Sequence, residues 1–149
     1  MSELAECKVG IAVSTYNSNI TRRLREGAIQ TLRSAGICDQ NILVAEVPGA
    51  WELPLACQQM FDSHSVDAVM ALGAVIRGET THDQHINRAV STALMEMMIK
   101  TGKPVGFGLL TCNTMEQAIH RAGGNVGNKG AETAEAVWAM LKLSIRPLK

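Results

Sequence analysis

The sequence has no long apolar run, no excess of either charge and no cysteine cluster, and each absence argues against a class of protein. No stretch approaches the roughly 20 apolar residues that cross a bilayer, and the first residues are acidic, so we expect neither membrane insertion nor secretion. Fourteen basic residues balance fourteen acidic ones, which disfavours a nucleic-acid partner. The four cysteines form no Cys-x-x-Cys pair and no zinc-ligand spacing, which is typical of reduced thiols in a cytoplasmic protein.

Aromatic residues are also scarce, because only five of the 149 residues are Phe, Trp or Tyr. Apolar residues nevertheless make up 46% of the chain, which is enough to build one buried core without disulfide bonds. No internal repeat and no low-complexity linker divides the sequence. We therefore expect a single domain spanning residues 1–149.

Short apolar runs alternate with amphipathic segments along the chain. The predicted strands cover residues 8–15, 41–47, 67–76 and 105–111. Three predicted helices cover residues 20–35 (approximately), 115–121 and 128–143. Two more are predicted to begin at 50–54 and near His82. Strand and helix thus alternate four times, which predicts an α/β fold with a doubly wound sheet of four parallel strands flanked by helices on both faces.

Nearly every residue of the third predicted strand is apolar, and the strand runs into a polar turn. Thr80 and Thr81 are good N-cap residues, so a helix is expected to begin near His82. Its unpaired backbone N–H groups, with Arg77 nearby, would suit an anion such as a phosphate. Histidine exchanges protons near neutrality, because its ordinary pKa is roughly 6.5. The pattern predicts a phosphate-bearing substrate with His82 as the proton carrier.

The exits of the first two predicted strands carry aromatic and acidic residues. Ligands bind at the carboxyl ends of the strands in such sheets. Tyr16 and Trp51 would therefore either stack on a flat heterocycle or cover the core. Glu52 either complements a helix dipole or binds a ligand hydroxyl or amine. Phe107 lies inside the fourth strand and would ordinarily be a core residue.

The remaining histidines do not indicate a metal-binding site. His82 and His85, assisted by Glu79 or Asp83, could be considered as ligands, but no other histidine or cysteine falls at ligand spacing, so we expect no metal. His64 is predicted to be a surface residue in the loop after the second helix.

Two glycine-rich stretches fail as nucleotide-binding motifs. Residues 123–130 lack the Gly-Lys-Ser/Thr of a Walker loop, and Gly106-x-Gly108 lacks the third glycine of a dinucleotide fingerprint. Arg121 and Lys129 flank the first stretch. They are interpreted either as anion contacts or as helix-terminal charges.

Four ordered motifs together resemble the 6,7-dimethyl-8-ribityllumazine synthase family. They are Val-Pro-Gly-Ala-Trp-Glu-Leu-Pro at 47–54, Ala-Leu-Gly-Ala-Val-Ile-Arg-Gly-Glu-Thr-Thr-His at 71–82, and the segments 115–123 and 127–130. The resemblance covers almost the whole chain and implies a flavodoxin-like sheet. It also implies a transferase of riboflavin biosynthesis that condenses 5-amino-6-(D-ribitylamino)uracil with 3,4-dihydroxy-2-butanone 4-phosphate, without metal or organic cofactor.

The resemblance also assigns roles to individual residues. The ribitylaminouracil would be held by Tyr16, Ala50, Trp51, Glu52, Ala74, Val75, Ile76 and Phe107. The phosphate would be held by Glu79, Thr80, Arg121 and Lys129, and His82 would be catalytic. The family forms homopentamers with each site between two subunits, so Phe107, Arg121 and Lys129 would come from a neighbour. Decamers and sixty-subunit shells are built from the same pentamer.

The chain departs from the family pattern after the histidine. Asp83 stands where the family often has an aromatic residue, and Asn87-Arg88 stands where it often has Asn-Glu. Two rival functions remain open at this point. One is a flavin mononucleotide-binding, flavodoxin-like module, although the loop 14–21 lacks the expected glycine. The other is a self-assembling shell without chemistry.

Overall fold

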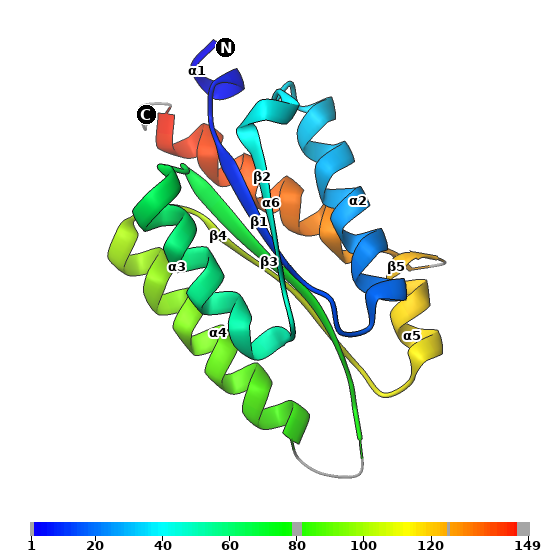
Figure 1. Cartoon of the computed structure of the whole chain (residues 1–149). Coiled ribbons are helices and arrows are strands. Elements are labelled where there is room, and N and C mark those ends of the chain that lie inside the picture. The colour runs from blue at the N-terminus through cyan, green and yellow to red at the C-terminus, as the bar shows by residue number, and fades with distance from the viewer. Residues whose placement is uncertain (1, 79–81, 125, 146–149) are drawn as a thin grey trace.

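The computed structural model describes residues 2–78, 82–124 and 126–145 and shows a parallel sheet between two layers of helices (Figure 1). The strands are β1 (Val9–Ser14), β2 (Ile42–Val47), β3 (Ala68–Ile76) and β4 (Val105–Cys112). They lie in the order β2-β1-β3-β4, and every neighbouring pair is parallel. This confirms the predicted doubly wound sheet.

The helices cover both faces of the sheet. They are α1 (Ser2–Ala5), α2 (Ser18–Ser34), α3 (Leu53–His64), α4 (His82–Thr101), α5 (Met115–His120) and α6 (Lys129–Ile145), with 3-10 turns η1 (Asp39–Asn41) and η2 (Ala50–Glu52). Figure 1 shows α3 and α4 on one face and α2, α5 and α6 on the other. Within the described residues, no helix has the length and apolar content that crossing a membrane requires.

The apolar stripes predicted from the sequence face the sheet. In α2, four residues at four-residue spacing are completely buried, namely Ile20, Leu24, Ala28 and Leu32. The helix ends at Ser34, and Gly36 follows with a φ of 102°, a conformation that favours glycine. Strand β3 is buried from Ala68 to Ala74, which explains why its sequence shows no alternation.

Four local features differ from the prediction. The sequence did not indicate α1 or the antiparallel hairpin of β5 (Ala122–Gly124) and β6 (Gly127–Asn128), because these elements are too short to show an apolar period. His64 lies in the last turn of α3 rather than in the loop after it, although it is exposed as expected. Phe107 is 42% exposed instead of buried, because β4 is the last strand in the sheet order.

The contact between α2 and α6 depends on a glycine. A Cβ on Gly130 would overlap the backbone carbonyl of Leu24, which cannot move without displacing α2. We expect Gly130→Ala to lower the free energy of unfolding by about 2 kcal/mol, although alanine ordinarily stabilises a helix relative to glycine. Urea denaturation of the variant and of a Gly78→Ala control, whose added Cβ meets nothing within 4 Å, would measure the effect. Equal stability of the two variants would contradict this packing argument.

Candidate active site

Hydrogen bonds join the exits of the first three strands. The backbone N–H groups of Thr15 and Tyr16 donate to the carbonyls of Val47 and Pro48 at 2.8 and 3.0 Å, which ties the end of β1 to the end of β2. Asn17 has a φ of 62°, and its Nδ2 donates to the carbonyl oxygen of Ala74 at 3.0 Å. This side chain therefore holds the first turn of α2 against the end of β3.

A cavity of about 360 Å³ lies at these joined strand ends. Its lining consists of Tyr16, Gly49, Ala50, Trp51, Ala74, Val75, Ile76, Gly78, His82, Asp83 and Ile86. Seven of these are residues that the family resemblance assigned to the substrate or to catalysis. The structure thus brings the predicted proton carrier and most of the predicted pyrimidine contacts together in one chain.

The two aromatic side chains of the cavity do not cover the core of this chain. Tyr16 is 73% exposed and Trp51 is 62% exposed. An exposed aromatic ring beside a cavity offers an apolar face and, for both residue types, a polar group at its edge. Of the two interpretations drawn from the sequence, the geometry therefore favours stacking on a flat ligand.

Glu52 contributes to the cavity only indirectly. Its Oε1 accepts a hydrogen bond from the backbone N–H of Gly49 at 2.9 Å, and the residue is not part of the cavity lining. This bond closes the short turn that carries Ala50 and Trp51. Its assignment as a pyrimidine contact remains a prediction.

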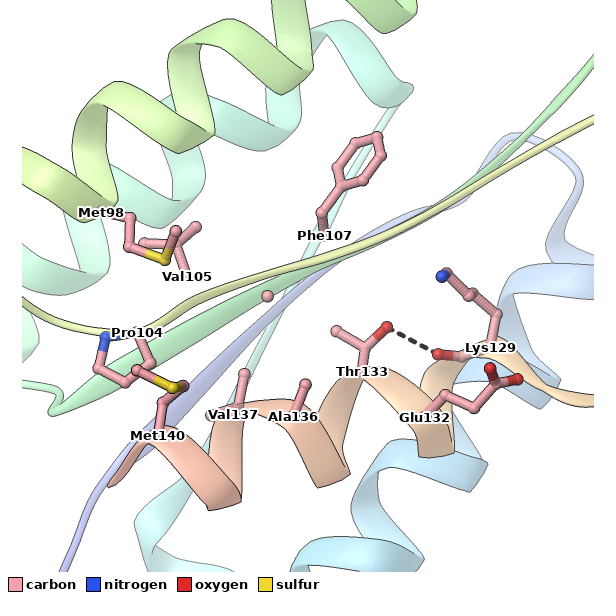
Figure 2. A pocket seen from close by; sticks show the side chains of 11 residues that line it. Met98, Pro104, Val105, Phe107, Lys129, Glu132, Thr133, Ala136, Val137 and Met140 are labelled. Atoms are coloured by element: carbon pink, nitrogen blue, oxygen red, sulfur yellow. Dashed lines mark hydrogen bonds between the residues drawn. The ribbon is translucent and has the colours of Figure 1, made fainter. Parts of the chain in front are cut away.

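Phe107 and Lys129 lie at a second cavity, of about 380 Å³, beside β4 (Figure 2). In Figure 2, Phe107 points from β4 toward the layer of α4, whereas Lys129 extends from the start of α6 on the other side of the strand. Asn128 fixes that helix start, because its Oδ1 accepts from the Ala131 N–H and its Nδ2 donates to the Arg23 carbonyl, each at 3.0 Å.

Arg121 lines a third cavity, of about 430 Å³, at the carboxyl end of β4. The hairpin β5–β6 brings it next to Lys129 along the backbone, because the Lys129 N–H donates to the Arg121 carbonyl at 2.8 Å. Cys112 lies in the same cavity. Burial raises the pKa of this thiol, and the positive charge of Arg121 opposes that rise. The guanidinium therefore lies close to the end of the edge strand.

The predicted site residues thus form two groups in one chain. Tyr16, Ala50, Trp51, residues 74–76 and His82 surround the first cavity, and Phe107, Arg121 and Lys129 surround β4. Glu79, Thr80 and the expected N-cap Thr81 lie outside the described residues. The described residues contain no group of three or more His, Cys, Asp and Glu side chains arranged to hold a metal ion.

Four cavity residues were not assigned to the substrate site from the sequence. Gly49 and Gly78 have no side chain to suggest a role. Asp83 and Ile86 follow His82 and are three positions apart, a spacing that puts these two side chains on the same side of a helix. This helical spacing was the available signal for Asp83, which is only 7% exposed.

Comparison with known proteins agrees with this geometry. A sequence model of the 6,7-dimethyl-8-ribityllumazine synthase family matches residues 6–144. The chain belongs to this family. All of the described strands and both groups of predicted site residues fall within the matched range.

Individual members of the lumazine synthase family are similar over nearly their full length. A 6,7-dimethyl-8-ribityllumazine synthase from Rhodopirellula baltica is 53% identical over 139 residues, which cover 93% of this chain and 90% of the relative. Proteins of the same name from two strains of Thermus thermophilus are 45% identical over 136 residues, covering 91% of this chain and 87% of each relative.

Proposed function

We propose that this chain condenses 5-amino-6-(D-ribitylamino)uracil with 3,4-dihydroxy-2-butanone 4-phosphate to give 6,7-dimethyl-8-ribityllumazine, phosphate and water. Family membership and the cavity at the strand ends support this function, and the grouping of His82 with two exposed aromatic residues is the observation that carries it. The reaction is a transferase step of riboflavin biosynthesis. A single domain, residues 1–149, would perform it without metal or organic cofactor.

The first half of the site would bind the pyrimidine. The ring stacks against Trp51 or Tyr16, and the backbone at the end of β3 supplies donors and acceptors to its edge. For His82 to assist its attack, the 5-amino group would have to face the start of α4. Holding two reactants in contact corresponds to effective molarities of about 10⁵–10⁸ M, so positioning supplies most of the acceleration.

The proton transfers would fall to His82. The 5-amino group attacks the ketone, water leaves to give an imine, and enolisation expels phosphate before ring closure and a second dehydration. Each of these steps gains or loses a proton. An imidazole near neutrality serves both directions, and a positioned acid or base contributes about 10²–10⁴ in rate.

The second half of the site would come from a neighbouring copy of the chain. Phe107, Arg121 and Lys129 lie at other cavities than His82, so one chain holds two incomplete halves. Three of the five aromatic residues are exposed in the single chain, which is unusual unless a partner covers them. We infer that β4 of one subunit faces the first cavity of the next in a homopentamer, from which decamers or sixty-subunit shells can also be built.

Mixing two damaged proteins tests the shared site. His82→Ala and Arg121→Ala subunits, dissociated, combined in equal amounts and reassembled, should recover about a quarter of wild-type activity, because about one site in four receives both native residues. Lumazine absorbance measures the recovery, and the two variants reassembled separately are the controls. Activity that stays at the sum of the controls, while labelled subunits demonstrably exchange, would place the whole site within one chain.

The direct test of the function is incubation of the purified protein with both substrates, followed by absorbance and mass detection of the lumazine. The flavin-binding alternative instead predicts a yellow protein that carries stoichiometric flavin mononucleotide and forms no product.

We also propose a cytoplasmic location, in keeping with four cysteines that are all present as thiols.

A further inference from the structure

Two buried side-chain oxygen atoms on α4 have no hydrogen-bond donor within the part of the chain that the structure describes. They are Oδ1 of Asp83, a residue only 7% exposed, and Oδ1 of Asn87. The residues are four positions apart on one helix, so their side chains are neighbours on the same face. An unsatisfied buried acceptor is destabilising, and two of them side by side require a structural explanation.

The contact between the Asn87 amide and Thr111 supplies a structural explanation for the two unsatisfied oxygen atoms. Asn87 Nδ2 lies 2.6 Å from Thr111 Oγ1 on β4. This distance is short for an N–H···O bond but normal for an O–H···O bond. A half-turn of the amide exchanges its nitrogen and oxygen without changing its shape. The Thr111 hydroxyl then donates to Asn87 Oδ1, and Asn87 Nδ2 takes the buried position beside Asp83.

We propose that Thr111, Asn87 and Asp83 form a hydrogen-bonded chain that holds the first turn of α4, and that Asn87 is thereby a positioning residue for His82. The Thr111 hydroxyl donates to Asn87 Oδ1, and Asn87 Nδ2 donates to Asp83 Oδ1. All the buried acceptors identified above are then satisfied. The inference rests on the proposed role of His82 in the condensation.

The three hydrogen-bonded side chains connect strand β4 to the wall of the first cavity that carries His82. Thr111 pairs in register with Val75, which lines the first cavity, and Asp83 adjoins His82 in the same cavity. A side chain anchored in this way keeps its orientation while its neighbour exchanges protons. Asp83, the residue after His82, is also one of the positions where this sequence departs from the usual family pattern, so the family pattern does not ordinarily supply this carboxylate.

The test combines substitutions with the His82→Ala background. Asn87→Leu should lower kcat about 10-fold and leave KM within about twofold, because a misplaced imidazole slows proton transfer without weakening binding. In His82→Ala, the same change should alter kcat by less than about twofold. Thr111→Ser should keep the wild-type rate, whereas Thr111→Val should behave as Asn87→Leu. Gln84→Leu, an exposed position on the same helix, is the matched control.

The outcomes separate this inference from the proposed function. An equal loss on adding Asn87→Leu to wild type and to His82→Ala would overturn the positioning role while leaving the condensation intact. A His82→Ala protein at the wild-type rate would instead overturn the role of His82. Melting temperatures of the single and double variants test whether the three side chains are hydrogen-bonded to one another. Thr111→Val combined with Asn87→Leu should melt no lower than the worse single variant, and full additivity would refute the chain.

Discussion

Replacing His82 with alanine is expected to slow lumazine formation about 10²-fold without abolishing it. The side chain lines the cavity that also holds Tyr16 and Trp51, at the first residue of α4. Loss of the imidazole removes proton transfer, but the reactants remain bound and oriented, and orientation is the larger contribution. Single-turnover kinetics at saturating substrate, followed by lumazine absorbance, would measure the chemical steps directly.

The matched control is His85→Ala. His85 is an exposed imidazole one turn further along α4 and is not part of the cavity lining. Its replacement should change the rate by less than about twofold, since a group outside the cavity cannot reach the reacting atoms. A His82→Ala protein that keeps the wild-type rate would remove this residue from the mechanism, and an equal loss in both variants would show that the effect arises from the helix rather than from one imidazole.

The strands and the long helices could be predicted from the sequence because their signals are local. The buried face of α2 follows from apolar residues at four-residue spacing, and the start of α5 follows from Thr114, whose hydroxyl accepts from the Gln117 N–H at 3.2 Å. The continuous apolar run of β3 likewise indicated a central parallel strand. In each case the residues that determine the structure lie within one or two turns of one another.

The site could be predicted only in part, because its geometry depends on contacts between distant residues. The bond from Asn17 to the Ala74 carbonyl joins two ends of the cavity lining that lie 57 positions apart, a separation that no local pattern of apolar residues indicates. Phe107 looked like a core residue because its neighbours in β4 are apolar. Its exposure follows from the place of β4 at the end of the sheet, which no local pattern determines.

The separation of the two groups of site residues also had no signal in the composition or the periodicity. The family resemblance implied this separation. In the structure, His82, Phe107 and Arg121 line three different cavities. Arg121 is exposed in the single chain. In the proposed homopentamer, a neighbouring subunit would displace the surrounding water and so strengthen the electrostatic interactions of this residue. Its contribution to catalysis would then depend on assembly.

For that reason Arg121→Ala is expected to have the largest effect of any single substitution considered, a fall in kcat/KM for the phosphorylated substrate of about 10³-fold. A planar guanidinium can bond two phosphate oxygens, and in the proposed role it would stabilise the negative charge that develops as the phosphate departs. The KM for the pyrimidine should change little. Arg121→Lys should restore only part of the loss, because an ammonium keeps the charge without the two-pronged geometry.

Two comparisons make the Arg121 result specific. Arg23→Ala removes an exposed guanidinium from α2 that lines none of the three cavities, and it should leave kcat/KM within about twofold of wild type. The unphosphorylated ketone 3,4-dihydroxy-2-butanone offers no phosphate to bind or expel. Any lumazine formed from it should appear at the same rate on wild type and Arg121→Ala, because the proposed role of this residue is confined to the phosphate. A comparable loss with both carbonyl substrates would instead mean that Arg121 supports the assembly as a whole, since breaking the subunit contact damages the pyrimidine pocket regardless of the second substrate.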